Sequence, residues 1–314
     1  MTEEVESSDV YLIDSSIYIF QAHFSPFVEC FDRDGGELSA LFGFTQFLLQ
    51  FLRRVKPNYV ATAHDESLFC GFRHQLSPDY KSNRELPDEN LGMQLKGCSE
   101  VCSIMGLPTF SSRVYEADDI IGTLANSVRN NNSSVQVQIL SKDKDLAQLL
   151  KSEKDCLWDY NQNSRRYRRD IFEEFGVHPE QFPDYLALIG DSVDCISGVP
   201  GVGPVKAKAL LQQFNSIEEI YQSIGLVSSL EIRGASGLAN KLQEYQDLAY
   251  LSKQLATIVC EVSDSEELFG SVALDGLKPE APDKEKFLEF LNLYNFSAPD
   301  KIRLESLAAS LTTR

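Results

Sequence analysis

The 314-residue sequence lacks the features that mark membrane, disulfide-rich and repetitive proteins. No run approaches the roughly 20 apolar residues that a membrane-spanning helix needs. The seven cysteines are scattered and include no CxxC pair, which argues against a disulfide framework, and we see no internal repeat or low-complexity segment. With 43% hydrophobic and 24% charged residues, the composition is typical of a soluble globular protein, and the length predicts two subdomains.

Targeting signals and a zinc site are missing as well. The acidic first ten residues contain no apolar segment and no arginine, so we expect no signal or transit peptide and a cytoplasmic protein with buried thiols. Cys98 and Cys102 lie one helical turn apart, but no pair of His or Cys residues completes a metal site. We therefore favour core packing for both cysteines.

The sequence has no basic excess. Its 29 Lys and Arg residues against 47 Asp and Glu residues give a net charge of −18. This argues against a generic nucleic-acid coat protein, which normally carries a basic excess. It is compatible with a metal-dependent nuclease, because such an enzyme concentrates acids at its metal site and keeps its basic residues local.

Motifs for nucleophilic catalysis are also absent. There is no GxSxG elbow and no P-loop lysine motif, and the four histidines are scattered. His64 lies beside Asp65, where a structural role explains it better than a general base does. Covalent catalysis is therefore disfavoured.

Strand and helix patterns alternate in the first part of the chain. Short apolar segments, most of them ending in an acid, predict strands at residues 10–14, 58–65, 135–143 and 156–160. Helical patterns lie between them, at residues 38–55, 91–105, 117–128 and 146–150. This alternation predicts an α/β fold with a mainly parallel central sheet flanked by helices.

The pattern changes beyond about Pro179 to short helices separated by Gly-rich turns. These helices are expected at residues 182–190, 204–214, 217–224 and 238–256, and a final helix near 284–294 precedes an amphipathic tail. We therefore predict an α/β catalytic domain over residues 1–178 and a helical subdomain with its tail over residues 179–314.

Acidic residues follow the ends of three predicted strands. Asp14, Asp65 and Asp143 occupy these positions, and Asp145 follows two residues later. Ligands of α/β sheets gather at the carboxyl ends of the strands, so these acids are expected to lie close together. For Asp143 and Asp145 the alternative is that they cap the helix that follows.

Two further groups of acids add to this set. Glu116, Asp118 and Asp119 crowd the start of a predicted helix, where the helix dipole favours one or two acids but explains a dense cluster poorly. Like charges this close repel unless a cation intervenes. Asp191 and Asp194 are spaced i, i+3 and can face one direction.

The nine carboxylates, with almost no His or Cys nearby, are typical of a site for Mg²⁺ or Mn²⁺. The ligand supply suits two ions. Two metals about 3.5–4 Å apart could orient and deprotonate a water while they stabilise the leaving oxygen of an in-line phosphoryl displacement. The sequence therefore predicts phosphodiester hydrolysis.

A segment with aromatic and basic residues is a candidate for contact with nucleic acid. A short helix is predicted near residues 77–90, with Ser77 as its N-cap, and on it Tyr80, Lys81 and Arg84 would share one face. Such a face suits a base and a phosphate, although a solvated surface helix has the same pattern.

A Gly-rich turn provides a second candidate for nucleic-acid binding. Gly198, Gly201 and Gly203 precede a helix that carries Lys206 and Lys208, so backbone N–H groups could approach a phosphate without reading bases. The alternative is an ordinary turn between helices.

The densest basic patch, Arg165 to Arg169, could contact DNA or form a solvated hairpin, and the sequence favours neither.

These residues together resemble the 5′ nuclease family, which includes the 5′-3′ exonuclease domain of bacterial DNA polymerase I, its stand-alone relatives and the flap endonucleases. The resemblance extends from about Val10 to Phe296, with no polymerase-like segment after it, so we expect a stand-alone form. The matching segments, in family order, are LIDSS, FR with LSPDYKSNR, YEADDIIGTLA, SKDKDLAQLL, LALIGDSVDCISGVPGVGPVKAKALL and LSKQLATI.

The resemblance implies a PIN-like or resolvase-like core, a C-terminal helix-three-turn-helix subdomain and two metal sites. It places Tyr80, Lys81 and Arg84 in a gateway over the active site, and K⁺ on carbonyls of the Gly198–Gly203 loop. One departure is Cys195-Ile196-Ser197, where the family usually has Asn-Ile-Pro. The acids matching the family's first metal site are Asp14, Asp65, Glu116 and Asp118, and those matching the second are Asp119, Asp143, Asp145, Asp191 and Asp194.

We therefore predict a monomeric, Mg²⁺-dependent 5′ nuclease that acts on DNA with a 5′ flap, a nick or a free 5′ end, without membrane contact. Two alternatives are weighed against this hypothesis. A PIN-like ribonuclease would share the acidic core, but the Gly-rich turn and the gateway segment speak against it. A non-catalytic DNA-binding module would not need nine mutually repelling acids.

Overall fold

The computed structural model describes residues 9–67, 69–132, 134–231 and 234–311. Residues 1–8 form most of the acidic start from which we expect no targeting peptide, and they lie outside the described residues. Among the described helices, none is long and apolar enough to cross a membrane.

A six-stranded sheet forms the centre of the α/β layer, in the order β3-β2-β1-β4-β5-β6. All neighbouring strands pair in parallel except β5 and β6, which confirms the predicted mainly parallel sheet. The short edge strands β3 and β6 were not predicted. The strands are β1 (Asp9–Asp14), β2 (Tyr59–Asp65), β3 (Thr109–Ser112), β4 (Gln136–Leu140), β5 (Cys156–Asp159) and β6 (Ser164–Arg166).

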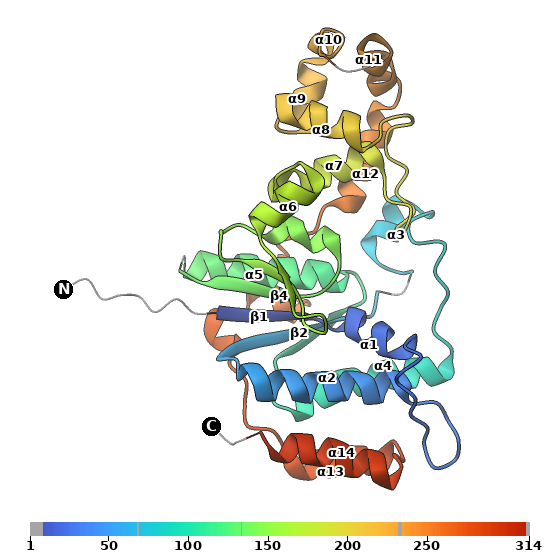
Figure 1. Ribbon diagram of the computed structural model, residues 1–314, viewed down its shortest axis with the longest axis vertical. Helices are drawn as coiled ribbons and strands as arrows, with labels where there is room; N and C mark the ends of the chain where they lie inside the picture. Colours follow the sequence, from blue (N-terminus) through green and yellow to red (C-terminus); the bar gives the residue numbers. More distant parts are fainter. Residues whose placement is uncertain (1–8, 68, 133, 232–233, 312–314) are drawn as a thin grey trace, which may run out of the picture.

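Helices cover both faces of this sheet. Successive side chains of a strand point to opposite faces, so Leu12 of β1 joins the core beneath α5 (Ala117–Asn131) whereas Ile13 joins the core beneath α2 (Ser39–Val55) and α4 (Glu89–Ile104). Figure 1 shows α5 on one side of the sheet and α2 with α4 on the other. The short helix α1 (Ser15–His23) starts directly at the end of β1.

The helical subdomain follows α6 (Arg168–Phe175) and extends away from the sheet (Figure 1). The expected helix over residues 238–256 is two helices, because the chain leaves helical geometry at Tyr245. The helices of this part are α7 (Phe182–Ile189), α8 (Pro204–Gln213), α9 (Ile217–Gln222), α10 (Ile224–Val227), α11 (Ala235–Glu244) and α12 (Gln246–Ala256).

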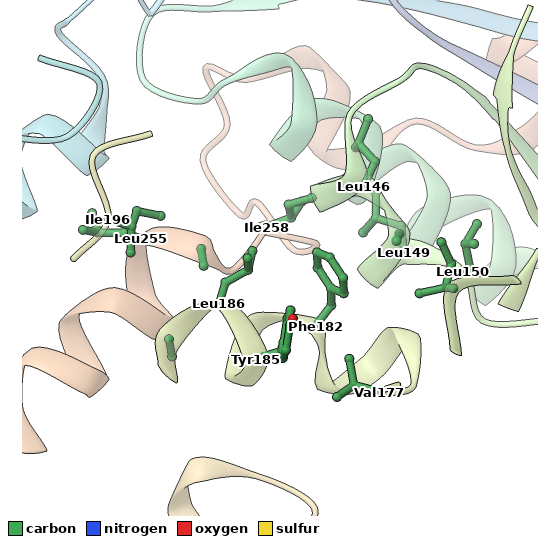
Figure 2. Packing of buried hydrophobic residues seen from close by; sticks show 14 of the residues in the cluster. Leu146, Leu149, Leu150, Val177, Phe182, Tyr185, Leu186, Ile196, Leu255 and Ile258 are labelled. Carbon is green, nitrogen blue, oxygen red and sulfur yellow. The ribbon is translucent and has the colours of Figure 1, made fainter. Parts of the chain in front are cut away.

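One apolar cluster joins the two parts of the molecule. Phe182 and Leu186 of α7 share it with Leu146 of the 3₁₀ helix η1 (Lys144–Leu149) and with Ile258, which follows α12 (Figure 2). Residues that follow the strand β4 are therefore packed directly against the first helix of the helical subdomain.

The last two helices return to the α/β layer. α13 (Lys284–Leu293) packs on α4, and α14 (Ala298–Ala309) packs on α2 (Figure 1). The predicted final helix and amphipathic tail thus lie against the first domain in space. The predicted boundary between residues 178 and 179 stays a prediction.

The prediction of a gateway helix near residues 77–90 is wrong. α3 (Phe72–Leu76) ends before Ser77, which is its C-cap, and residues 78–83 form turns. The backbone N–H of Lys81 donates to the carbonyl oxygen of Asp194 at 3.1 Å, and Lys81 has a left-handed φ of 51°. This long-range hydrogen bond and the burial of Tyr80 outweigh the local helix signal.

The cysteines are free thiols, and the expectation that all are buried is only partly right. Cys98 and Cys102 lie in the core, as expected. Cys70 is exposed, and Cys195 and Cys260 are half-buried; all three lie in turns or loops rather than in a helix or strand.

Candidate functional site

Five of the nine predicted acids line one cavity at the carboxyl edge of the sheet. Asp14 ends β1 and Asp65 ends β2, whereas Asp143 follows β4 and the others lie at the start of α5. Parallel pairing of β1 with β2 and β4 brings these strand ends together. The cavity measures about 780 Å³, and its acidic lining comprises Asp14, Asp65, Glu116, Asp118 and Asp143, with Glu85 and Asp88 at its rim.

Mutual repulsion and burial leave part of this lining protonated near neutral pH. Burial, with smaller contributions from the charges of Asp143 and Asp65, raises the pKa of Asp14 to about 7, although a 2.8 Å hydrogen bond from Ser141 opposes the shift. Burial also raises the pKa of Asp118 well above its ordinary range, again with help from Asp143 and Asp14. A divalent cation would replace these protons.

Glu116 is the acid of this cavity that the chain's own cations hold in its ionised form. It accepts hydrogen bonds from Lys81 Nζ at 2.8 Å and from Tyr80 Oη at 3.0 Å. Burial would raise the pKa of Glu116, but the charges of Lys81 and Arg73 outweigh it and lower the pKa. The predicted residues Tyr80 and Lys81 therefore reach the site, although from turns rather than from a helix face.

Arg84 reaches a neighbouring acid. Its Nη2 donates to Asp194 Oδ1 at 2.8 Å, and Lys81 Nζ lies 3.8 Å from the other oxygen of that carboxylate. Burial raises the pKa of Asp194, whereas the charges of Lys81 and Arg84 lower it. Lys81 is thus shared between Glu116 and Asp194, at the edge of the cavity.

Lys144 forms ion pairs with two further predicted ligands, Asp145 and Asp191. Lys144 donates to Asp191 and lies 3.2 Å from Asp145 Oδ1. Burial and the charge of Asp143 raise the pKa of Asp145 to about 7, although Lys144 opposes them. Asp143 also accepts from the N–H of Asp145 at 2.9 Å, so it caps η1 as well as lining the cavity.

The structure contradicts the prediction that Asp119 is a metal ligand. Asp119 Oδ2 accepts from Arg73 Nη1 at 2.6 Å and from the backbone N–H of Glu116 at 3.0 Å. Asp119 Oδ1 accepts from Arg73 Nη2 at 2.7 Å and from the backbone N–H of Val259 at 2.9 Å. Asp119 is fully buried and does not line the cavity. Its carboxylate is saturated by protein donors, so no lone pair is left for an ion.

The described residues contain no group of three or more His, Cys, Asp or Glu side chains that is arranged as a metal site. The donor chemistry nevertheless fits Mg²⁺ or Mn²⁺, since all the donors are carboxylate oxygens and several hold protons that a cation can displace. Coordination would require these side chains to turn toward one another and away from Lys144, Lys81 and Arg84.

His64 fits the predicted structural role. It is buried and within hydrogen-bond distance of Ser15 Oγ, at 3.2 Å. Burial lowers its pKa to about 4, so the ring is neutral at physiological pH.

The Gly-rich turn has two positions that require glycine. Gly198 has a φ of +65°, and a Cβ there would lie 2.2 Å from the backbone nitrogen of Gly190; Gly201 has a φ of +79°. Gly203, by contrast, has open space around it. Lys206 Nζ donates to the Gly201 oxygen at 2.9 Å.

The other predicted lysine of this segment is partly engaged. The stem of Lys208 lies against Gly176, where an added Cβ would be 2.8 Å from its Cδ. Its ammonium group is therefore held nearer α6 than that of Lys206, and we rank it second among the two candidates for phosphate contact.

The Arg165–Arg169 patch is a hairpin edge followed by α6, and its arginines have protein partners. Arg165 stacks on Trp158, with its guanidinium carbon 4.1 Å from the ring centre. Three others form ion pairs with glutamates. These pairs are Arg166 with Glu174, Arg168 with Glu153 and Glu180, and Arg169 with Glu173.

Two cations of the site, Arg73 and Lys144, were missed by the sequence reasoning. Lys144 stands between two predicted ligands in SKDKD, and a cation in that place is a signal of charge compensation. Arg73 lies in the FR segment, and no local pattern links it to Asp119, which is 46 residues away.

Family models match nearly the whole described chain. The 5′-3′ exonuclease N-terminal resolvase-like domain matches residues 9–176, and the 5′-3′ exonuclease C-terminal SAM fold matches residues 177–284.

Curated relatives include both stand-alone and fused proteins. The chain is 33% identical over 253 residues to the 5′-3′ exonuclease of Buchnera aphidicola subsp. Schizaphis graminum, covering 81% of this chain and 87% of that protein. It is 31% identical over 294 residues to DNA polymerase I of Caldicellulosiruptor bescii, covering 91% of this chain and 32% of that protein. The chain thus spans about a third of the length of the polymerases that it matches.

Solved structures share the fold. T5 5′-exonuclease with bound divalent zinc ions has a TM-score of 0.62 at 21% identity, covering 91% of this chain and 99% of that chain. The catalytic core of Rad2 in complex with DNA substrate has a TM-score of 0.61 at 15% identity, covering 98% of this chain and 93% of that chain. The predicted α/β core with a C-terminal helical subdomain is confirmed.

Proposed function

The chain belongs to the 5′-3′ exonuclease family, and we propose that it is a structure-dependent 5′ nuclease that hydrolyses DNA phosphodiester bonds with two Mg²⁺ or Mn²⁺ ions. The predicted family is confirmed. The observation that carries the proposal is the cavity in which five carboxylates from separate parts of the chain meet at the sheet edge, with Lys81 beside them.

Divalent ions fit the acids that remain available. We assign one ion to Asp14, Asp65, Glu116 and Asp118, and the second to Asp143, Asp145, Asp191 and Asp194. Bound ions would activate a water and stabilise the leaving oxygen. The T5 exonuclease structure with zinc and the T5 D15 flap endonuclease pseudo-enzyme-product complex with DNA and metal ions support this assignment by analogy.

The cations at the rim would orient the scissile phosphate. Lys81 carries a buried ammonium group that lies between Glu116 and Asp194, so a phosphate entering the cavity meets a cation that is already desolvated. Arg84 is about half-exposed and can bind a phosphate nearer to solvent. Tyr80 is buried, so we assign it to positioning Glu116 rather than to base stacking.

The Gly-rich turn and α8 would bind duplex backbone. Gly203 and Pro204 begin α8 without a side-chain cap, which leaves backbone N–H groups open to a phosphate. The K⁺ site implied by the resemblance fits this loop poorly, because the ammonium group of Lys206 already binds the Gly201 oxygen and would repel a second cation there. Our proposal therefore gives K⁺ no role.

The preferred DNA structure is part of the proposal. The similar solved structures include a flap endonuclease in a pseudo-enzyme-product complex with DNA, the Rad2 core with DNA substrate and GEN1 with Holliday junction DNA, so branched or 5′-ended DNA is the substrate class we propose. The match of residues 177–284 to the exonuclease C-terminal domain disfavours a PIN-like ribonuclease.

The test uses end-labelled 5′-flap, nicked, blunt and single-stranded DNA, with an RNA of the same sequence, each with Mg²⁺ or with EDTA. We expect Mg²⁺-dependent release of products from the 5′ side of structured DNA, and loss of cleavage in the Asp143→Asn variant. Cleavage of RNA in preference to DNA would support the ribonuclease, and binding without cleavage would support a non-catalytic module.

A further inference from the structure

We propose that Arg73 is a positioning residue, which fixes the acid-bearing start of α5 to the chain segment that leaves the helical subdomain. We call the set formed by Arg73, Asp119 and the backbone of residues 255–259 the Arg73 latch. This inference rests on the proposed function, because it concerns how the cleavage site is aligned with the duplex-binding helices.

The first half of the latch is a buried ion pair. Arg73 is 3% exposed and Asp119 is fully buried, and two parallel hydrogen bonds of 2.6 and 2.7 Å join them. Burial alone would lower the pKa of Arg73, but the hydrogen bonds and charge of Asp119 raise it above its ordinary range. Removal of either partner would therefore leave an uncompensated buried charge.

The second half of the latch binds the end of α12. Arg73 Nε donates to the carbonyl oxygen of Leu255 at 2.9 Å, and Nη2 donates to that of Thr257 at 2.8 Å. The N–H of Val259 donates to Asp119 Oδ1 at 2.9 Å. Three backbone groups within five residues are thus held by one guanidinium–carboxylate pair.

Both residues of the Arg73 latch contact Glu116, an acid of the cavity. Asp119 Oδ2 accepts the backbone N–H of Glu116 at 3.0 Å, and Arg73 Nη1 lies 3.4 Å from Glu116 Oε2. Glu116 lines the acidic cavity. A shift of residues 255–259 would therefore be passed to a cavity acid through the Asp119 carboxylate and through the Arg73 guanidinium.

The Arg73 latch is also connected to the Gly-rich turn, through α12. Ser252 lies on α12 one turn before Leu255, and its hydroxyl accepts the N–H of Gly198 at 3.2 Å. α12 also packs along α7, which ends just before this turn. The segment that we assign to duplex backbone and the acids that we assign to metal are thereby joined through α12 and Arg73.

The informative variant is Arg73→Lys. A lysine keeps the positive charge opposite Asp119, but its single ammonium group cannot span the carboxylate and both carbonyl oxygens as the planar guanidinium does. Asp119→Asn is the reciprocal variant, since it retains the shape while it removes the charge that Arg73 needs. Both are to be compared with wild type by thermal unfolding, to establish that they are folded.

The matched control is Arg129→Lys. Arg129 lies on α5, the helix that also carries Asp119, and donates to the buried Asp155 at 2.8 Å and to the carbonyl oxygen of Leu149 at 3.0 Å. It has the chemistry of the latch but no contact with the cavity acids or with residues 255–259. This variant therefore measures the general cost of weakening a buried Arg–Asp pair.

We expect Arg73→Lys to slow single-turnover cleavage of a 5′-flap substrate on the order of 10- to 100-fold at saturating DNA and Mg²⁺, because catalytic alignment is lost. Its affinity for duplex DNA in EDTA should stay within about threefold of wild type, and raising Mg²⁺ should not restore the rate. Arg129→Lys should cleave within about twofold of wild type. A rate within twofold for Arg73→Lys, or an equal loss in both variants, would overturn the proposal.

Hydrogen exchange provides a readout that does not depend on cleavage. In wild type, duplex DNA should slow exchange at residues 255–259 and at the start of α5; in Arg73→Lys the protection at α5 should be lost while that at the Gly-rich turn remains. If wild type does not cleave DNA, the proposed nuclease fails, yet this exchange pattern would still show the coupling. If DNA protects α5 equally in both proteins, the latch does not couple the two sites.

Discussion

The two groups of acids assigned to the two metals differ in how the protein treats their charge. All four acids of the first group line the cavity, and of these Glu116 alone has cationic partners in the described structure. In the second group only Asp143 lines the cavity, and the other three acids, Asp145, Asp191 and Asp194, form ion pairs with lysine or arginine. The second group is thus largely neutralised by lysine and arginine, whereas the carboxylates of the first group mostly repel one another.

This difference indicates two routes by which ions can bind. In the first group the carboxylates would lose protons on binding an ion, since Asp14 and Asp118 have raised pKa values. In the second group Asp145, whose pKa is raised to about 7, would also lose a proton, but the acids would mainly have to part from ammonium and guanidinium groups, above all from Lys144. Burial would raise the pKa of Asp191, but the hydrogen bond and charge of Lys144 lower it. A metal ion and Lys144 would thus compete for the same oxygens.

The largest effects are expected from acids that face the cavity. Asp118→Asn and Asp143→Asn should each reduce single-turnover cleavage on the order of 1,000-fold or more, because an amide cannot replace a bridging or ligating carboxylate. DNA affinity should be unchanged or improved, because a negative charge near phosphates is removed. Near-normal turnover of either variant at saturating Mg²⁺, measured on a 5′-flap substrate, would disprove the assignment of the cavity.

Next in size are the rim cations, which link the two groups through Asp194 and Glu116. Lys81→Ala should slow cleavage on the order of 100-fold and Arg84→Ala about 10-fold, since Lys81 is buried whereas Arg84 is 48% exposed. Rapid-quench measurements at saturating DNA would compare them. A loss confined to DNA affinity would move both residues to the duplex-binding surface, and equal rates for the two variants would refute the argument from burial.

The strand-end acids were predictable because their signal is local. An acid that directly follows a buried apolar strand lies at the carboxyl edge of the sheet, and this does not depend on distant parts of the sequence. Parallel pairing of the strands then brings such acids close together. The structure brings Asp14, Asp65 and Asp143 to one cavity on this basis. The short edge strands β3 and β6 lack such a signal, since their few residues are half-buried or exposed except for Ser112, which is buried but polar.

What could not be predicted depends on partners distant in sequence. The prediction of a gateway helix failed because the backbone N–H of Lys81 donates to the carbonyl oxygen of Asp194, 113 positions away in the chain, rather than to a carbonyl of its own segment. Asp119 looked like its neighbour Asp118, yet the two side chains point to different surroundings, one to the cavity and one to Arg73. Adjacent helix positions face different directions, and sequence alone does not say which direction holds the metal.

The protonated acids of the cavity predict a dependence on pH. Asp14 and Asp145 have folded pKa values of about 7, above the ordinary value of 3.8, so the metal-free fold binds more protons than the unfolded chain between these values. Their ionisation therefore destabilises the metal-free protein as pH rises through that window, and it favours metal. Apparent Mg²⁺ affinity, measured by calorimetry, should fall about 10-fold from pH 8 to pH 6.

The control for this effect is the variant Asp14→Asn. The metal-free wild type loses stability as Asp14 ionises, and the variant lacks this loss. The thermal midpoint of metal-free Asp14→Asn should therefore rise relative to that of metal-free wild type as pH increases from about 5 to about 8. A constant difference between the two proteins across this range would contradict the raised pKa of Asp14.

The smallest effect is expected at the Gly-rich turn, which tests whether binding and cleavage are separate. Lys206→Ala should weaken duplex binding a few-fold for all sequences alike and lower the slope of log affinity against log salt by about one unit, because one phosphate contact is lost. Cleavage at saturating DNA should be unchanged, since Lys206 does not line the acidic cavity and α8, which carries it, lies apart from the strands of the sheet (Figure 1). The matched control is Lys286→Ala on α13, at the opposite end of the molecule, which should alter neither quantity.

Fluorescence anisotropy over a range of KCl concentrations would measure DNA binding by both variants. A salt slope equal to that of wild type would remove Lys206 from the DNA-binding surface, and a slower cleavage rate at saturating DNA would show that this turn also positions the scissile strand.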